Sequence, residues 1–195
     1  MEHMKNGIIY KIVRSIVHFF YFLNLVEGFK WLFSVFNKKK KRELKTIAID
    51  VFIICKWIFL ILIWYFRCNE PFILGFVIYL IWTNIFTYFY YHVWKDEREI
   101  NRHRKRRRFV SLMLAVLFSN VAFAFLYDVG FSQFYEIAVG FGGQYSFLLF
   151  SFHNSLFADY QYITPINNFG YTISLIQLLI TFIFGSIVLN NSIPD

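Results

Sequence analysis

The chain has 195 residues, of which 58% are hydrophobic, 23% are aromatic and only 16% are charged, and its net charge is +8. This composition excludes a disordered chain, which is polar and poor in aromatic residues. It also excludes an ordinary soluble domain, because about a quarter of the residues of such a domain are charged. The sequence therefore predicts a membrane protein.

The positive charge is concentrated in two short segments. Residues 38–45 hold six basic residues and one acidic residue, and residues 95–108 hold eight basic and three acidic residues. Each segment adjoins about 20 apolar residues, which is not typical of a soluble nucleic-acid-binding protein, so we expect no nucleic-acid partner. Basic side chains here can hold anionic lipid headgroups or an acidic cytoplasmic protein. The residues concerned are Lys38, Lys39, Lys40, Lys41, Arg42, Arg102, Arg104, Lys105, Arg106, Arg107 and Arg108.

Four apolar segments are long enough to cross about 30 Å of hydrocarbon as helices. They are residues 46–66, 71–94, 109–127 and 170–189. The positive-inside rule places both basic segments on the cytoplasmic side. The sequence thus predicts an all-α integral membrane protein with both termini in the cytoplasm and with residues 128–169 outside or dipping into the membrane.

The N-terminal region differs from these spans. A narrow stripe of polar residues recurs at helical spacing in an otherwise apolar segment, which predicts an amphipathic helix in the cytoplasmic interface. The stripe consists of Lys11, Arg14, His18, Glu27, Lys30, Ser34 and Asn37. A fifth span that turns this stripe toward protein is the alternative, and it would place the N-terminus outside. The chain then divides into an N-terminal region (1–45), a two-span hairpin with its basic segment (46–108) and a third module (109–195).

Polar residues occur at similar depth inside three of the spans. Lys56 lies near the middle of the first span, and Asn84 and Asn120 lie near the middle of the next two. A charged side chain in lipid is costly, so we expect Lys56 to face protein, with Asn84, Asn120 or Asp50 as its partner. Such a group either clasps the helices together or serves in gating or sensing. Cys55 and Cys68, about 20 Å apart along one helix, cannot pair within the chain.

Residues 144–157 are apolar but too short to span, which favours a re-entrant helix. The residues after it, 158–168, are polar and lack helical periodicity. Non-helical backbone at membrane depth must be buried in protein or line a water-filled cavity. The order of span, short helix, irregular loop and span is typical of a pore module.

This module resembles the pore domain of potassium channels and their pore-loop relatives. Residues 157–162, with the sequence FADYQY, fall on the selectivity filter. Thr164 and Pro165 fall on the segment after it, Gly170 follows five residues beyond Pro165, and Ser151 matches a serine of the pore helix. The resemblance implies a homotetramer around a central pore.

The filter departs from the family pattern. Asp159 and Gln161 stand where the family has glycines, which let successive carbonyls turn toward the pore axis, and Phe157 stands where it has threonine. We therefore expect a cation channel without potassium selectivity. Residues Phe157, Ala158, Asp159, Tyr160 and Gln161 would form the pore mouth.

In a tetramer, Asp159 would give a ring of carboxylates that favours cations, with Asp128 and Glu136 adding to a negative outer vestibule. Alternatively, Asp159 caps its own loop through a hydrogen bond to the backbone. Gln177, Thr181 and Gly185 share one face of the last span, either as pore lining or as a tight helix contact.

Nothing in the sequence forms a catalytic or cofactor-binding motif. Five histidines are scattered without paired metal-ligand spacing, and neither a phosphate-binding glycine loop nor a nucleophile motif is present. We therefore expect no enzyme activity, metal or cofactor.

A second interpretation is a non-conducting membrane sensor or anchor that recruits or regulates a soluble cytoplasmic protein through its basic segments. In size, in its four spans and in the expected absence of a cytoplasmic domain, the chain resembles membrane subunits of bacterial phage-defence systems of the Kiwa type. That resemblance implies the bacterial inner membrane and a role in antiviral defence.

Overall fold

The computed structural model describes residues 7–36, 41–94 and 102–192. In this part of the chain the helical elements are α1 (Ile8–Phe22), α2 (Leu25–Phe36), α3 (Lys41–Tyr65), α4 (Pro71–Phe89), the π-helical η1 (Tyr90–Trp94), α5 (Arg102–Phe125), the π-helical η2 (Leu126–Gly130), the 3-10 turn η3 (Ser132–Phe134), α6 (Gln144–Ser155) and α7 (Asn168–Ser192). Two short strands, β1 (Tyr135–Ile137) and β2 (Ile163–Pro165), complete the fold.

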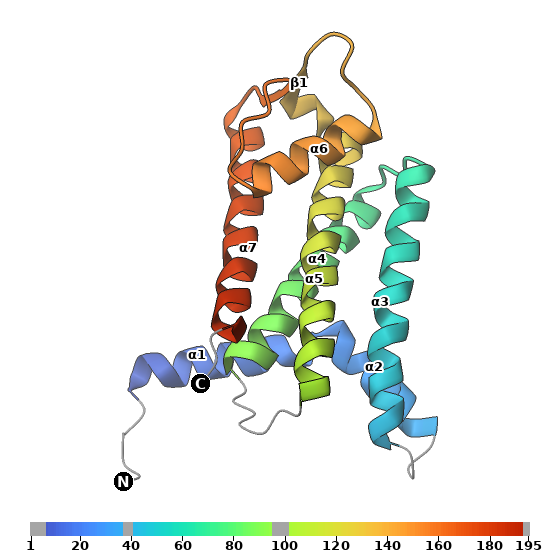
Figure 1. Ribbon diagram of the computed structural model, residues 1–195, viewed down its shortest axis with the longest axis vertical. Helices are drawn as coiled ribbons and strands as arrows, with labels where there is room; N and C mark the ends of the chain where they lie inside the picture. Colours follow the sequence, from blue (N-terminus) through green and yellow to red (C-terminus); the bar gives the residue numbers. More distant parts are fainter. Residues whose placement is uncertain (1–6, 37–40, 95–101, 193–195) are drawn as a thin grey trace.

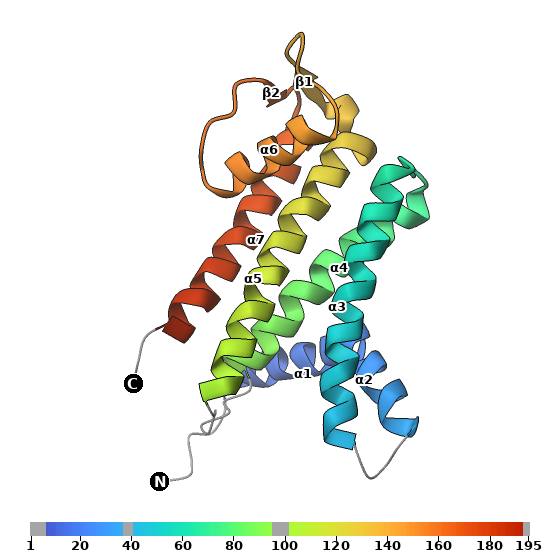
Figure 2. The ribbon, with the colours of Figure 1, turned by 45° about the vertical axis from the view of Figure 1, so that its right-hand side comes forward.

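The long helices α3, α4, α5 and α7 run between the two ends of the molecule (Figures 1 and 2). Their stretches that can cross a membrane are Leu44–Tyr65, Pro71–Phe89, Phe109–Gly130 and Asn168–Ile187, and a fifth span results only if the bent pair α1–α2 counts as one. The chain is thus a multi-span helical membrane protein, and the four predicted segments are present as long apolar helices. Cys55 and Cys68 are both free thiols.

The structure moves several predicted boundaries. The second span ends as an α-helix at Phe89 and continues as the π-helical turn η1 rather than as α-helix to residue 94. The basic residues from Arg102 onward form the first turns of α5, not a loop, and Lys41 and Arg42 begin α3. Lys38, Lys39 and Lys40 lie outside the described residues.

The N-terminal helices do not follow the direction of the bundle. They meet at a bend of 53°. Figures 1 and 2 show α1 lying crosswise at the end of the molecule where α7 also finishes, with α2 beside the first part of α3. One face of α1 packs on the bundle through Val17, while Ile9, Ile12 and Phe19 are exposed.

A small sheet at the opposite end corrects the all-α prediction. β1 and β2 pair antiparallel, with Glu136 opposite Thr164. The sheet packs so closely on the first turn of α7 that a Cβ at Gly170 would lie 2.7 Å from the carbonyl oxygen of Phe134. Only glycine fits this contact, and Asn167 caps the same turn by accepting a hydrogen bond from the Gly170 amide at 3.0 Å. Gly170 therefore lies inside the first turn of α7 rather than at its start.

Helix α5 forms the centre of the bundle. Of its spanning stretch 56% is buried, against 28–33% for the other three. Phe118 and Phe125 of α5 and Tyr127 of the following η2 are completely buried in the main core. The outward faces of α3, α4 and α7 carry exposed large apolar residues, as expected for helices that meet lipid or other copies of the chain.

Candidate functional site

A neutral polar network attaches α6 to α5 and α7. The Gln177 side chain of α7 is 1% exposed. Its Nε2 lies 2.7 Å from Ser151 Oγ, 2.9 Å from the Ser151 carbonyl and 3.1 Å from Asn120 Oδ1. Its Oε1 accepts hydrogen bonds from Tyr127 OH at 2.7 Å and from Asn154 Nδ2 at 2.8 Å. Buried amides are stable only when bonded in this way, so the network fixes α6 in one position.

The same network sets the depth that α6 reaches. Ser151 Oγ donates to the backbone carbonyl of Asn120 at 2.7 Å. Asn120 lies near the middle of the span Phe109–Gly130, and Gln177 lies near the middle of Asn168–Ile187. The chain after α6 returns to pair β2 with β1, at the end from which α6 started (Figure 2).

The predicted filter residues lie on the loop that follows α6. Phe157 is 72% exposed, Ala158, Asp159 and Gln161 are exposed, and Tyr160 is half-buried. His153 and Tyr160 pack with their ring centroids 5.0 Å apart. Within the described residues no hydrogen bond reaches the Asp159 carboxylate, so a local cap is not seen. Of the residues after the loop, Thr164 is exposed and Pro165 lies against Gly170.

The three residues predicted to share a face of α7 do share it, but they differ in their surroundings. Gln177 is used entirely in contacts between helices of the same chain. The Thr181 hydroxyl donates to the Gln177 carbonyl at 3.0 Å, within its own helix. Gly185 is exposed and has open space around it. The structure thus places Gln177 in a helix contact rather than in a pore lining.

A second polar group lies between α3, α4 and α5. Lys56 is 6% exposed, and its Nζ donates to Asn84 Oδ1 at 2.7 Å. Asn84 Nδ2 donates to the Ala115 carbonyl at 2.8 Å, and Lys56 Nζ lies 4.3 Å above the Phe118 ring. Of the three predicted partners of Lys56, the structure therefore brings Asn84 to it. Asn120 belongs to the Gln177 network, and Asp50 pairs with Arg107 at 2.7 Å at the edge of the bundle.

The expectation that Asp128 adds to a negative vestibule is wrong. Its carboxylate is buried and accepts hydrogen bonds from Trp64 Nε1 at 2.8 Å and from Arg67 at 3.0 Å. The sequence interpretation missed this contact because Arg67 lies 61 residues earlier in the chain. Glu136, on β1, is exposed as expected.

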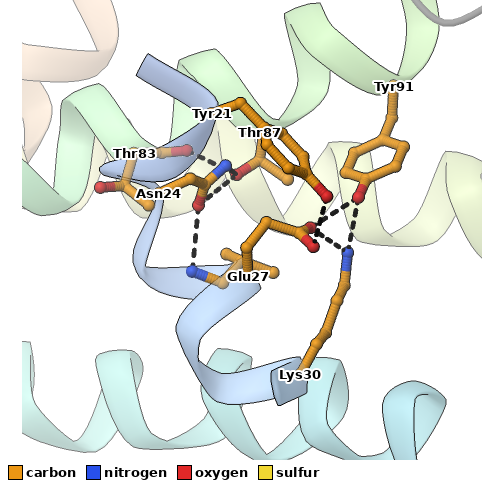
Figure 3. Close-up of polar contacts among 8 residues, drawn as sticks. Tyr21, Asn24, Glu27, Lys30, Thr83, Thr87 and Tyr91 are labelled. Carbon is orange, nitrogen blue, oxygen red and sulfur yellow. Dashed lines mark hydrogen bonds and ion pairs between the residues drawn. The ribbon is translucent and has the colours of Figure 1, made fainter. Parts of the chain in front are cut away.

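A third polar group attaches the N-terminal helices to η1 (Figure 3). We call it the Glu27 cluster, and it consists of Tyr21, Glu27, Lys30 and Tyr91. Glu27 Oε1 accepts from Lys30 Nζ at 2.6 Å and from Tyr91 OH at 2.5 Å, and Oε2 accepts from Tyr21 OH at 2.9 Å. Lys30 Nζ also donates to Tyr91 OH at 3.0 Å.

The cluster keeps Glu27 ionised. Burial alone would raise the pKa of Glu27, but hydrogen bonds from Lys30, Tyr91 and Tyr21 and the charge of Lys30 together lower it below its ordinary value. Burial and the hydrogen bond to Glu27 raise the pKa of Tyr21 to about 12, so this hydroxyl stays protonated. The cluster is therefore a carboxylate surrounded by three donors.

The bend between α1 and α2 is fixed beside this cluster. Asn24 is 2% exposed; its Oδ1 accepts from the Val26 amide at 3.0 Å, and its Nδ2 donates to Thr87 Oγ1 at 2.9 Å. About two helical turns before Thr87 on α4, Tyr79 OH donates to the Leu23 carbonyl at 2.5 Å. Sequence reasoning identified Glu27 and Lys30 only as polar positions. The hydroxyl residues Tyr79, Thr83, Thr87 and Tyr91 recur every four residues, and this stripe was the available signal for a polar contact.

Comparison with known proteins does not assign the chain to a family. No family model, curated protein or solved structure matches it. Among the described residues, no three His, Cys, Asp or Glu side chains form a group that could hold a metal ion. We therefore infer the function from the geometry of α6, of the loop that follows it and of the polar groups.

Proposed function

We propose that this chain is the subunit of an oligomeric, pore-loop-type membrane protein that passes cations without potassium selectivity. The observation that carries the proposal is the depth of α6, whose Ser151 bonds to Asn120 near the middle of α5. A helix that enters to mid-depth and a chain that returns to the same side form a re-entrant element. The segment from α5 to α7 would then be the pore module.

The exposed loop supports assembly into an oligomer. Residues 156–159 are all exposed, and they follow a helix that ends at mid-depth. Irregular backbone at this depth cannot face lipid, because its polar groups would lack partners. Other copies of the chain, or a water-filled cavity that they enclose, are the surroundings that satisfy this requirement. The resemblance to potassium channels favours four copies.

The charge of the loop supports the choice of ion. Asp159 is exposed and accepts no hydrogen bond in the described part of the chain, so its carboxylate is available to face an axis. A ring of carboxylates favours cations over anions. Asp159 and Gln161 at the glycine positions argue against a filter of carbonyl oxygens, and hence against potassium selectivity.

The basic residues and the N-terminal helices support one orientation. α1, the start of α3 and the start of α5 lie at the same end of the molecule (Figure 1). We infer that this end is cytoplasmic, with both termini inside, that α1 lies in the membrane interface, and that the basic residues near 41–42 and 102–108 hold anionic headgroups of the inner leaflet.

Reconstitution into planar bilayers tests conduction. We expect the intact oligomer to carry current. In a salt gradient, the reversal potential should have the sign of a cation-selective pore, and the permeabilities of Na⁺ and K⁺ should be nearly equal. Asp159→Asn should reduce the preference for cations, whereas Glu70→Gln, which neutralises an exposed carboxylate of the α3–α4 turn, should not. An intact oligomer without current would overturn conduction, and an unchanged preference in Asp159→Asn would overturn the carboxylate ring.

A specific observation favours a second function, that of a non-conducting sensor or anchor. The exposed face of α7 is apolar and carries Leu175, Leu179 and Phe182, so a bore lined by this face would resist ions. The Glu27 cluster also ties the N-terminal helices to η1, which lies shortly before the basic start of α5. Such a protein would signal to a soluble partner, in keeping with the resemblance to phage-defence subunits.

Recovery of a partner from cells tests this alternative. Neutralising Arg104, Lys105, Arg106, Arg107 and Arg108 together should abolish recovery of an acidic cytoplasmic protein that the unmodified chain retains. Unchanged recovery would argue against docking at the start of α5.

A further inference from the structure

The C-terminal end of α6 holds a phenylalanine in a conformation that favours glycine. The Phe157 amide donates to the Asn154 carbonyl at 3.2 Å, and the Ala158 amide donates to the His153 carbonyl at 2.9 Å. This pair of bonds is a Schellman cap, whose left-handed residue is usually glycine. Phe157 occupies that position with φ of +57°. A bulky residue there is strained, which calls for a compensating contact of its side chain.

The end of α3 shows such compensation. Arg67 has φ of +49°, its amide bonds to the Trp64 carbonyl at 3.1 Å, and the Cys68 amide bonds to the Ile63 carbonyl at 2.9 Å. This is the same cap, again without glycine. Here the side chain gains a partner, because the Arg67 guanidinium pairs with the buried carboxylate of Asp128 at 3.0 Å.

Among the described residues, Phe157 has no ion pair, hydrogen bond or ring contact of its side chain that would compensate in this way. Its side chain is 72% exposed. Glycine would relieve the strain and remove a side chain that is mostly exposed in the single chain. A compensating contact would therefore come from outside the described chain.

The residues next to Phe157 indicate whether lipid or protein covers its side chain. Asp159 and Gln161, on the same loop, are exposed polar side chains next to backbone that forms no regular structure. Acyl chains cannot cover this surface, but another protein surface or an enclosed cavity can. Because the described chain itself leaves the loop uncovered, a second copy is the occupant that fits.

We propose that Phe157 is a contact residue between copies of this chain, with its ring packed against a neighbouring copy where the loops meet. The proposal rests on the oligomer of the proposed function and deepens it, because it names the residue that joins the subunits at mid-depth. Ion passage itself does not depend on it.

Photo-crosslinking in membranes tests the contact directly. Phe157 is replaced by p-benzoylphenylalanine, and the control carries the same probe at Ile58, an exposed position on α3, on the far side of the bundle from α7 (Figure 1). We expect light to join two chains through position 157 and to give only lipid adducts at position 58. Lipid adducts alone at both positions would overturn the proposal.

The substitution Phe157→Gly provides a second test, because a cap that faces lipid and a contact between copies predict different changes in the stability of the oligomer. If Phe157 were only a strained cap facing lipid, Phe157→Gly would raise the unfolding temperature and leave the dissociation temperature of the detergent-solubilised oligomer unchanged. We expect instead that the oligomer dissociates at a lower temperature although the single chain unfolds no earlier. An oligomer of Phe157→Gly as stable as the original would overturn the proposal.

The two failures are distinguishable. An oligomer that conducts cations but gives no chain-to-chain product at position 157 would remove the proposed contact and leave the proposed function in place. A protein that remains monomeric in membranes would remove both.

Discussion

The Gln177 network, near the middle of the spans, and the Glu27 cluster, beside the N-terminal helices, attach helices by different chemistry. The Gln177 network holds α6 to α5 and α7 with neutral, mostly buried groups, whereas the Glu27 cluster holds α1 and α2 to η1 through an ion pair with partly exposed side chains. A neutral buried network responds little to pH or salt, while an ion pair near water responds to both. We therefore expect the attachment of the N-terminal helices to depend more on pH and salt than the attachment of α6 does.

The largest effect is expected from Gln177→Leu. This change leaves Tyr127 OH and Asn120 Oδ1 without their buried partner, whereas Asn154 Nδ2 keeps its hydrogen bond to the Ser174 carbonyl at 3.1 Å. Each unpaired group costs about 1–3 kcal/mol, so we expect about 3–4 kcal/mol of destabilisation from the two together. The thermal unfolding of the purified protein measures it. Thr181→Val, one turn along α7, is the matched control, because its hydroxyl bonds only within its own helix. Equal stability of the two variants would contradict the role of the network.

A smaller loss is expected from Asp128→Ala in η2, at the end of the third span. Trp64 Nε1 would lose its buried acceptor, which costs about 2 kcal/mol, while the loss of Arg67 adds little because that side chain is 57% exposed. Denaturant unfolding measures the change. Glu136→Ala, which removes an exposed carboxylate of β1, should leave stability the same within about 0.5 kcal/mol. A similar loss in both variants would show that burial of Asp128 is not the cause.

Removing the charge of Glu27 should release the N-terminal helices only. In Glu27→Gln the ion pair with Lys30 is lost, and we expect the attachment of α1–α2 to weaken by about 1–2 kcal/mol. A spin label at Gly28, where a side chain has open space, should become more mobile, whereas a label at the exposed Tyr145 of α6 should not. Both labels require prior replacement of the free Cys55 and Cys68. Equal mobility changes at the two positions would contradict the separation of the two attachments.

The smallest expected effect is a pH dependence of the attachment of the N-terminal helices that the attachment of α6 does not share. The pKa of Glu27 is lowered in the folded chain, so its contacts stabilise the attachment fully above its ordinary value of 4.5 and are lost as the pH falls through the lowered pKa. The label at Gly28 should therefore become mobile on acidification below that value, and the label at Tyr145 should remain unchanged. Release that begins at neutral pH would assign the switch to another group.

Much of the fold follows from the sequence because hydropathy and charge act locally. The four apolar spans, the short helix after residue 143 and a group of three candidate partners for Lys56 that includes Asn84 were all accessible in this way. The structure corrects the ends of the spans, since a helix can continue beyond the membrane, as α5 does toward Arg102.

Contacts between distant segments were not accessible. Nothing near Asp128 in the sequence indicates Arg67, and nothing near Glu27 indicates Tyr91, because each pair meets only when separate helices pack. Gln177 shows the same limit: its position on a shared face was evident, but whether that face met a pore or another helix depended on where α6 lies.

The central claim is that the loops after α6 surround an axis shared by several copies. One image of the purified particle in a lipid disc, viewed along the membrane normal, tests it most directly. We expect rotational symmetry, with residues 156–162 of every copy next to the axis and the α3 helices at the rim. A single chain, or an assembly with these loops facing lipid at its outer edge, would contradict it.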